Sequence, residues 1–305
     1  MRLLVLGGTR FVGRHAVEAA LRAGHEVTLF NRGISGGDLF PGVRALIGER
    51  GGDHAALKAG TWDAVVDACG YRPAEVRAAA AALRGRCGHY LFISTVSAYA
   101  EFEKGGDEGA PLWRPAEEGY GPLKVACEDA LTRDWGAKLM IARPGLVAGP
   151  YDHTDRFTYW PVRLARGGRV LTPALDKPAQ FTDARDFGAW LVASAAAGRT
   201  GTFNCVGNAL PFGELLDACG GGDYGVASDD FLVENGVAPY TDLPLWIPGR
   251  VAPFDGAKAR AAGFVSRPVA DTARDALAWR RASGEPALNA GLSAAREAAL
   301  LRALA

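Results

Sequence analysis

The sequence of 305 residues carries no excess of either charge, because 34 basic side chains balance 34 acidic ones. A protein that binds nucleic acid or an anionic membrane through its overall field would carry an excess of basic residues. The charge balance therefore predicts a small-molecule partner, with neither a nucleic acid nor a membrane as the partner.

Cysteine is scarce, and its spacing excludes the common zinc motifs. No C-x-x-C and no paired Cys/His spacing occurs. The cysteines are odd in number and scattered along the chain: Cys69, Cys87, Cys127, Cys205 and Cys219. We expect reduced thiols packed in the core and no metal site.

Long apolar runs, internal repeats and low-complexity tracts are also missing. No segment reaches the roughly 18 consecutive apolar residues that a membrane-spanning helix needs. Residues 2–6 run directly into a predicted strand, without the basic region and longer apolar stretch of a secretion signal. A cytoplasmic location is the expectation.

The first 150 residues alternate short apolar runs with alanine-rich helical patterns, which is the rhythm of βαβ units in a parallel sheet. Strands are expected at 3–6, 26–30, 43–47, 64–68, 90–93 and 139–142. Helices are expected between them at 11–22, 73–83 and 120–135. The predicted fold class is α/β, a doubly wound Rossmann sheet.

The chain is long enough to add a second, smaller lobe, because single cores stop growing near about 250–300 residues. Beyond residue 150, aromatics and prolines gather at 151–160 and 231–248, a composition that suits a pocket wall. A return to the sheet is expected at 202–206, and further helices at 183–197, 269–282 and 293–305. We predict a Rossmann domain at 1–150 with 180–207 returning to it, and a substrate-binding region at 151–179 and 208–305.

A glycine-rich turn follows the first predicted strand and precedes a predicted helix. Such a turn lets the backbone approach a pyrophosphate, whose charge is met by the amides of the helix N-terminus. The predicted cofactor-binding residues of this turn are Gly7, Gly8, Thr9, Arg10, Phe11, Val12 and Gly13. The middle glycine of the usual motif is replaced by arginine.

The second predicted strand ends in Asn31-Arg32, where an NAD-selective site would present Asp or Glu to the ribose. Arg32 and Arg10 are suited to charge-assisted bonds with a 2′-phosphate, although two solvated surface arginines are the alternative. These residues predict NADP(H) as cofactor. Further cofactor contacts are expected at the ends of the third and fourth strands, from Glu49, Ala68, Cys69 and Gly70.

The predicted catalytic group consists of Thr95, after the fifth strand, and Tyr120 and Lys124 on the following helix. Residues at i and i+4 of a helix share one face, so Tyr120 and Lys124 should point together. A nearby ammonium would lower the pKa of the tyrosine toward working pH and make it a usable general acid or base.

The order and spacing of these motifs over about the first 190 residues resemble the extended, or atypical, short-chain dehydrogenases/reductases, also called the NAD-dependent epimerase/dehydratase family. Within that family, GGTRFVG and LFNRG resemble isoflavone-reductase-like proteins and relatives of chloroplast stem-loop-binding proteins. The resemblance implies that Thr95 bonds the reacting oxygen, that Tyr120 moves the proton and that Lys124 also holds the nicotinamide ribose. It places the remaining cofactor contacts at Ser94, Pro144 and Val147. Dimers that pair through helices are common in the family, which makes a homodimer one possibility, but nothing in the sequence demonstrates one.

Three features select among the family's reactions. Val96-Ser97 follow Thr95, whereas sugar-nucleotide 4,6-dehydratases carry Asp-Glu there. The acid after the second strand that holds NAD in epimerases is missing, and Val147-Ala-Gly-Pro150 lacks the family's usual tyrosine. We therefore predict reduction of a carbonyl or imine by hydride transfer. The alternatives are a sugar epimerase or other redox isomerase, and a non-catalytic nucleotide- or RNA-binding relative.

The segment 151–160 is the expected substrate contact, because it follows the last strand at the predicted mouth of the site. Predicted substrate-binding residues there and on the fifth strand's loop are Tyr99, His153, Arg156, Tyr159 and Trp160. Arg156 would bind an acidic substrate group, or else pair with Asp152 or Asp155. Ordinary core packing is the alternative for Tyr99, and a structural role is the alternative for His153.

Overall fold

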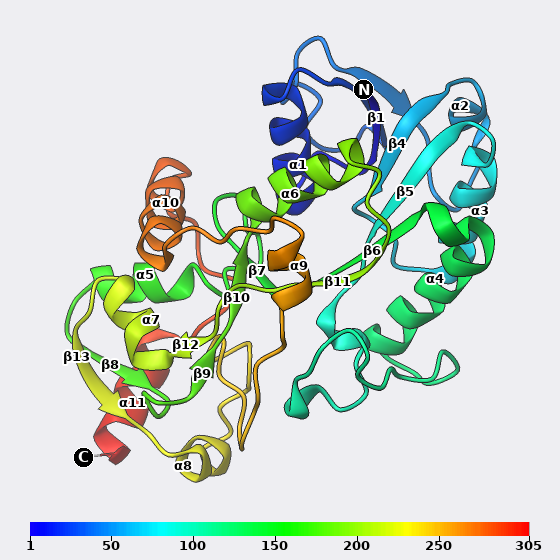
Figure 1. The fold of residues 1–305 in the computed structure, drawn as a ribbon. Helices are drawn as coiled ribbons and strands as arrows, with labels where there is room; N and C mark the ends of the chain where they lie inside the picture. The colour runs from blue at the N-terminus through cyan, green and yellow to red at the C-terminus, as the bar shows by residue number, and fades with distance from the viewer. Residues whose placement is uncertain (305) are drawn as a thin grey trace.

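The computed structural model describes residues 1–304, and a parallel sheet of seven strands organises its larger lobe (Figure 1). The strands are β1 (Arg2–Leu6), β2 (Glu26–Asn31), β3 (Arg44–Ile47), β4 (Trp62–Asp67), β5 (Cys87–Ile93), β6 (Leu139–Pro144) and β11 (Gly201–Cys205). Their spatial order is β11-β6-β5-β4-β1-β2-β3, so the order reverses between β1 and β4. All six predicted strands are present, and the predicted return at 202–206 forms the edge strand β11.

Alternation along β1 shows why this sheet is covered on both faces. Leu3 and Val5 point into one core, and Leu4 and Leu6 point into the other, because successive side chains of a strand face opposite ways. The exception is β3, which lies at the edge and is largely exposed.

The covering helices begin and end close to where the sequence predicts them. One face carries α1 (Phe11–Arg22) and α6 (Ala184–Ala196), and the other carries α3 (Pro73–Leu83) and α4 (Tyr120–Trp135). Short helices α2 (Ala55–Lys58) and η3 (Gly136–Lys138) complete the connections. Pro73 opens α3, where its missing N–H costs nothing.

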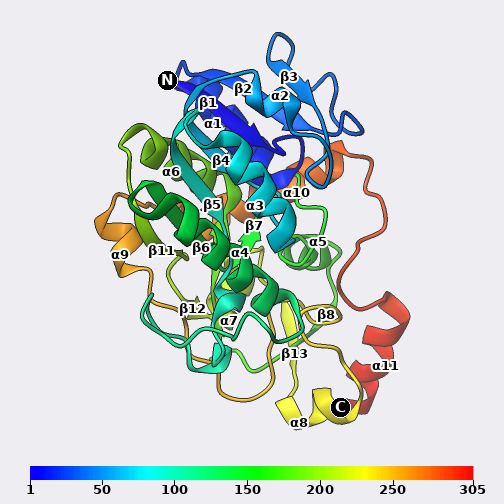
Figure 2. The same cartoon turned by 90° about the vertical axis from the view of Figure 1, so that its right-hand side faces the viewer.

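The smaller lobe has its own apolar core around Trp160, Phe212 and Trp246. Its short strands pair as β7 (Leu146–Ala148) with β10 (Phe181–Asp183), β8 (Arg169–Thr172) with β13 (Asp223–Val226), and β9 (Pro178–Ala179) with β12 (Leu210–Pro211). Its helices are α5 (Tyr159–Ala165), α7 (Phe212–Ala218), α8 (Asp229–Glu234), α10 (Val269–Ala282) and α11 (Ala294–Leu304). Figure 2 shows this lobe beneath the carboxyl ends of the sheet strands.

One segment assigned by prediction to the substrate-binding region packs elsewhere. Helix α9 (Ala257–Ala261) lies against β11, and Ala259 and Phe264 are buried in the core of the larger lobe. The prediction for 257–264 was therefore wrong. Trp190 of α6 makes an edge contact with Phe264, which closes that face of the sheet.

Across residues 1–304, no helix combines the length and the apolar character required to cross a lipid bilayer.

Candidate active site

A cavity of about 1450 Å³ lies at the carboxyl ends of the sheet strands, between the two lobes. Ligand pockets usually measure roughly 300–1,000 Å³, so this cavity has room for a dinucleotide and a second molecule. The predicted residues in its wall are Gly7, Gly8, Thr9, Arg10, Phe11, Val12, Gly13, Asn31, Arg32, Glu49, Ala68, Cys69, Ser94, Thr95, Tyr120, Pro144, Val147, His153 and Arg156. The structure thus brings most of the predicted site together at the switch point of the sheet.

The glycine turn has the geometry that a pyrophosphate requires. Gly7 and Gly8 have φ angles of 98° and 92°, which side-chain-bearing residues rarely adopt. A Cβ on Gly13 would lie 2.8 Å from the backbone nitrogen of Gly8, so only glycine fits there. Helix α1 begins at Phe11 without a capping side chain, which leaves its first amides for an anion. The residues present therefore fit the phosphates of a dinucleotide.

Arg10, in the glycine turn, and Arg32, after β2, are exposed on the cavity wall. Among residues 1–304, no carboxylate pairs with either guanidinium within 4 Å. The side chain of Asn31 is already engaged, since its Oδ1 accepts a hydrogen bond of 2.8 Å from the amide of Gly33. Two cations without a carboxylate partner therefore line this end of the cavity, whose wall also carries Glu49 and Glu75.

A buried ion pair beneath the cavity was not predicted. Arg50 donates to both carboxylate oxygens of Asp67, at 2.6 and 2.8 Å, and also to the sulfur of Cys69. Asp67 is fully buried and further accepts from the hydroxyl of Tyr90 at 2.7 Å. A buried acid at the end of a strand indicates that a cation lies nearby, but the sequence alone does not identify Arg50 as the partner of Asp67.

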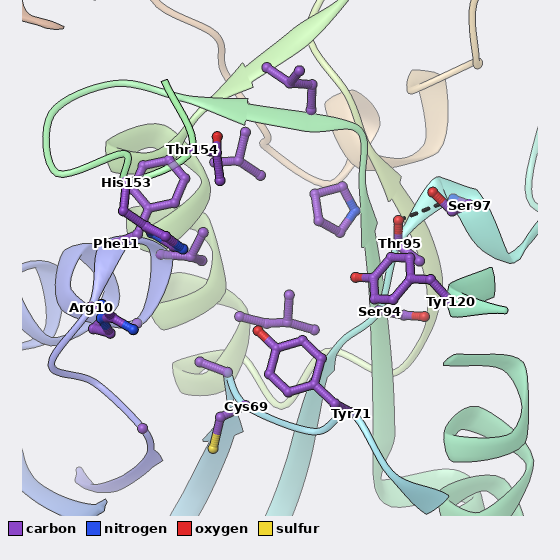
Figure 3. A pocket seen from close by; sticks show the side chains of 18 of the residues that line it. Arg10, Phe11, Cys69, Tyr71, Ser94, Thr95, Ser97, Tyr120, His153 and Thr154 are labelled. Carbon is purple, nitrogen blue, oxygen red and sulfur yellow. Dashed lines mark hydrogen bonds between the residues drawn. The ribbon is translucent and has the colours of Figure 1, made fainter. Parts of the chain in front are cut away.

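Thr95 and Tyr120 lie on one wall of the cavity, and Arg10, Phe11 and His153 lie across from them (Figure 3). Thr95 is buried at the start of the short helix η1 (Val96–Ala98), where its Oγ1 accepts from the amide of Ser97 at 3.1 Å. Tyr120 opens α4, and its side chain is about half exposed to the cavity. Two hydroxyls are thus presented to the same space.

Lys124 does not contact Tyr120 as predicted. Its Nζ donates to the carbonyl oxygens of Gly70 at 2.8 Å and Ile93 at 2.7 Å, and the residue is buried behind the cavity wall. Burial lowers the pKa of Lys124 to about 8. Gly70 is likewise absent from the wall, because it packs against Phe92 and serves as an acceptor for this lysine.

The expected lowering of the tyrosine pKa is therefore wrong for this structure. Burial raises the pKa of Tyr120, and the nearby Tyr71 raises it further. The Thr95 hydroxyl and the Arg156 charge oppose that rise without reversing it. Tyr120 is accordingly a protonated phenol, suited to donate rather than to abstract a proton.

Tyr99 was predicted to contact substrate, but it belongs to a buried polar network behind the site. Its hydroxyl donates to Asn204 at 2.6 Å and accepts from Arg143 at 3.0 Å. Arg143 also pairs with Glu128 of α4 at 2.5 Å, and the Ser94 hydroxyl donates to that same carboxylate. The network ties the loop that follows β5 to α4, β6 and β11.

Tyr159 and Trp160 were also predicted at the substrate, and both predictions were wrong. The two residues begin α5 and are buried in the core of the smaller lobe, where Trp160 donates to the carbonyl of Pro244 at 3.0 Å. Aromatic composition alone does not distinguish a pocket wall from a core. His153 and Arg156, earlier in the same segment, do line the cavity.

Several wall residues escaped prediction because they come from irregular loops far along the chain. Tyr71 follows β4, and the remaining members lie between the short elements of the smaller lobe. These later residues are Gln180, Val251 and Phe254, whereas Tyr240, Leu245 and Ile247 lie in the segment 231–248 that was predicted to form a pocket wall. No periodic pattern marks them in the sequence. Within residues 1–304, no three His, Cys, Asp or Glu side chains gather as a metal site.

No model of a known protein family matches the chain. Among curated proteins, chloroplast stem-loop binding protein of 41 kDa b from Arabidopsis thaliana is 25% identical over 193 residues. That match covers 56% of this chain and 49% of the chloroplast protein, so it spans about half of the relative.

Solved structures match over nearly the whole chain. A nucleoside-diphosphate-sugar epimerase from Pseudomonas aeruginosa superposes with a TM-score of 0.71 at 22% identity, covering 93% of this chain and 99% of its own. UDP-glucuronic acid 4-epimerase from Bacillus cereus, in complex with NAD, gives 0.70 at 14% identity, with 94% and 99% covered. The Bordetella bronchiseptica enzyme WbmH, in complex with NAD+, gives 0.70 at 19%, with 93% and 99% covered.

These likenesses and the sheet order give the chain the fold of the extended short-chain dehydrogenases/reductases, the NAD-dependent epimerase/dehydratase fold.

Proposed function

We propose that the protein is a nicotinamide-dinucleotide-dependent oxidoreductase that prefers NADP(H) and reduces a carbonyl or imine of a small molecule. The cavity at the switch point of a Rossmann sheet carries this proposal, since its glycine turn fits a pyrophosphate. The unpaired Arg10 and Arg32, with Asn31 in place of an acid, support a 2′-phosphate rather than a bare ribose. The fold shared with structures solved with NAD supports the cofactor class.

The protein's own contribution to this reaction is positioning and proton transfer. A bound nicotinamide would supply the hydride chemistry. Thr95 would donate a hydrogen bond to the reacting oxygen, and Tyr120 would give that oxygen its proton. The raised pKa of Tyr120 suits the donor role, because the phenol stays protonated at neutral pH. Lys124 would act indirectly, because its ammonium fixes the backbone carbonyls of Gly70 and Ile93 behind the cavity wall.

A redox isomerase such as a sugar epimerase is the second candidate, favoured by the epimerases among the structural neighbours. The two candidates differ in the fate of the cofactor. A reductase must release oxidised cofactor and bind fresh NADPH, whereas an epimerase returns the hydride and keeps its cofactor. Cofactor content and exchange therefore separate them.

The test is a fluorescence titration of the purified protein with NADPH and NADH, after release and identification of any nucleotide purified with it. We expect NADPH to bind at least about tenfold more tightly than NADH, since charge-assisted bonds contribute about 1.5–3 kcal/mol. Arg10→Ala and Arg32→Ala should each remove much of that preference. Arg22→Ala, at the exposed end of α1 outside the cavity, is the matched control.

Equal affinities, or tightly retained NAD, would overturn the NADP(H) reductase and favour the epimerase. Failure to bind either dinucleotide would overturn both candidates.

A further inference from the structure

We propose that the second molecule in the cavity is an apolar monocarboxylate, whose carboxylate pairs with Arg156 while its carbon body lies against the apolar wall. This proposal rests on the proposed oxidoreductase function and names its substrate class. A small apolar keto acid would supply both the carboxylate that pairs with Arg156 and the carbonyl that the proposed oxidoreductase reduces.

The cavity divides into two chemically different ends. Its acidic wall residues, Glu49 and Glu75, both lie at the dinucleotide end, around the loop after β3. The wall beyond Tyr120 is mostly apolar, with Phe102, Pro178, Leu245, Ile247, Val251 and Phe254. At this end Arg156 provides the formal positive charge, and no carboxylate of the described residues lines the wall beside it.

Arg156 pairs with neither of the acids next to it in sequence. Asp155 is fully buried, where it accepts from the amide of Asn289 at 2.9 Å and lies 3.3 Å from a guanidinium nitrogen of Arg280. Asp152 accepts from both the amide and the hydroxyl of Thr154 through Oδ1, at 2.8 and 2.7 Å, while its buried Oδ2 has no hydrogen-bond partner among residues 1–304. Neither acid comes within 4 Å of Arg156 in the described chain, so the predicted pairing was wrong.

The guanidinium is held but not saturated. Its Nε donates to the Thr154 hydroxyl at 3.3 Å, and the structure gives its two terminal nitrogens no partner among residues 1–304. The fork that remains matches the two oxygens of a carboxylate. The charge of Arg156 also reaches Tyr120 and Tyr240, since it opposes the burial that raises the pKa values of both phenols.

Local backbone strain marks the same region. Asp155, Tyr240 and Leu245 have φ angles of 58°, 60° and 67°, in the left-handed region that side-chain-bearing residues rarely occupy. Such strain persists where surrounding contacts impose it, and it gathers at ligand sites. Here Asp155 directly precedes Arg156 in the chain, and Tyr240 and Leu245 line the same cavity.

The wall disfavours a nucleoside diphosphate at this end. Two phosphates need several donors, and a base and ribose need polar partners. Besides Arg156 this wall offers Ser97, His153 and Tyr240 but no second arginine or lysine among residues 1–304, and Gln180 is not available. Its amide already donates to the carbonyls of Gly207 and Phe254 and accepts from the amide of Phe254. One charged group on an apolar body is what this end can satisfy.

The test is calorimetric titration of the NADP+-saturated protein with 4-phenylbutyrate, 4-phenylbutyramide and UDP, which separate a carboxylate from a neutral isostere and from a nucleotide. We expect the carboxylate to bind about tenfold or more tightly than the amide. Arg156→Gln should abolish this difference, and Arg156→Lys should retain part of it. Arg166→Gln, an exposed cation outside the cavity, should change nothing.

Equal binding of acid and amide, no saturable binding of either, or a preference that survives in Arg156→Gln would overturn the proposal. Tighter binding of UDP that depends on Arg156 would overturn it in favour of a nucleotide substrate. An Arg156→Gln protein that loses NADPH affinity about tenfold would assign this cation to the cofactor instead. If the protein binds no dinucleotide, the oxidoreductase fails, while the same titrations of the free protein still test Arg156.

Discussion

Removing the charge of Asp67 should destabilise the protein more than any surface substitution. The carboxylate is fully buried and accepts four hydrogen bonds, from Arg50 at 2.6 and 2.8 Å, Tyr90 at 2.7 Å and the amide of Cys69 at 3.2 Å. Asp67→Asn leaves the guanidinium of Arg50 buried at 8% exposure, with an amide nitrogen now facing it. Breaking a buried pair in this way costs about 3–5 kcal/mol.

The partner substitution and the double variant turn this expectation into a cycle. Arg50→Met should cost about 3 kcal/mol, because the carboxylate keeps the bonds from Tyr90 and Cys69 but loses its counter-charge. Arg50→Met/Asp67→Asn should cost less than the sum of the two single variants, by about 2 kcal/mol or more, since neither charge is left unpaired.

The assay is urea unfolding at pH 7 followed by circular dichroism. At a urea m-value of about 3 kcal/mol/M, the Asp67→Asn midpoint should fall by roughly 1 M or more. Arg72→Gln is the control, because Arg72 forms an exposed ion pair with Glu75, and its urea midpoint should fall by far less. Single variants within about 1 kcal/mol of the parent protein, or strictly additive losses in the double variant, would refute the reasoning.

Three other outcomes can be measured on the same protein. Tyr120→Phe should lower kcat by about 10²–10⁴-fold. Because a proton donor works at pH values below its own pKa, and the pKa of Tyr120 is raised, the reduction rate of the parent protein should stay constant up to at least about pH 9. A decline in that rate centred near neutral pH would contradict the donor role. Between about pH 8 and 10, Lys124 is protonated in the unfolded chain but not in the folded protein. The unfolding free energy of the parent protein, relative to that of Lys124→Met, should therefore rise with pH over this range. A difference that stays constant with pH would refute the burial of this ammonium. Gly13→Ala should weaken NADPH binding by about tenfold or more, because the new Cβ meets the nitrogen of Gly8. Gly24→Ala is the control: its Cβ would enter open space after α1, so it should strain the backbone of a turn without changing NADPH affinity.

Periodicity predicted the elements of the larger lobe well, because each strand and helix there buries a complete apolar face. Helices α1, α3 and α4 begin and end at the predicted residues. The glycine turn was equally predictable, since its φ angles and tight contacts require particular residues.

The failures concern side chains whose direction is set by tertiary contacts. Lys124 was expected to face Tyr120 from one helical turn away, but two backbone carbonyls draw its ammonium inward. Tyr159 and Trp160 carry the same composition as a pocket wall, yet the smaller lobe needs them as its core. The freedom of Arg156 depends on Arg280 and Asn289, more than a hundred residues away in the chain.

The path of the chain between its lobes limits how the protein can be rebuilt. The larger lobe is assembled from three separate stretches, 1–144, 184–205 and 257–264, which supply the sheet and the helices α6 and α9 that cover one of its faces. A fragment that stops at residue 150 would lack α6, which packs on α1, and would lack β11. Strand β6 would then become an exposed edge of the sheet, which invites aggregation. Grafting a different smaller lobe onto this sheet would therefore require splicing at every crossing, with the packing of α6 and α9 preserved.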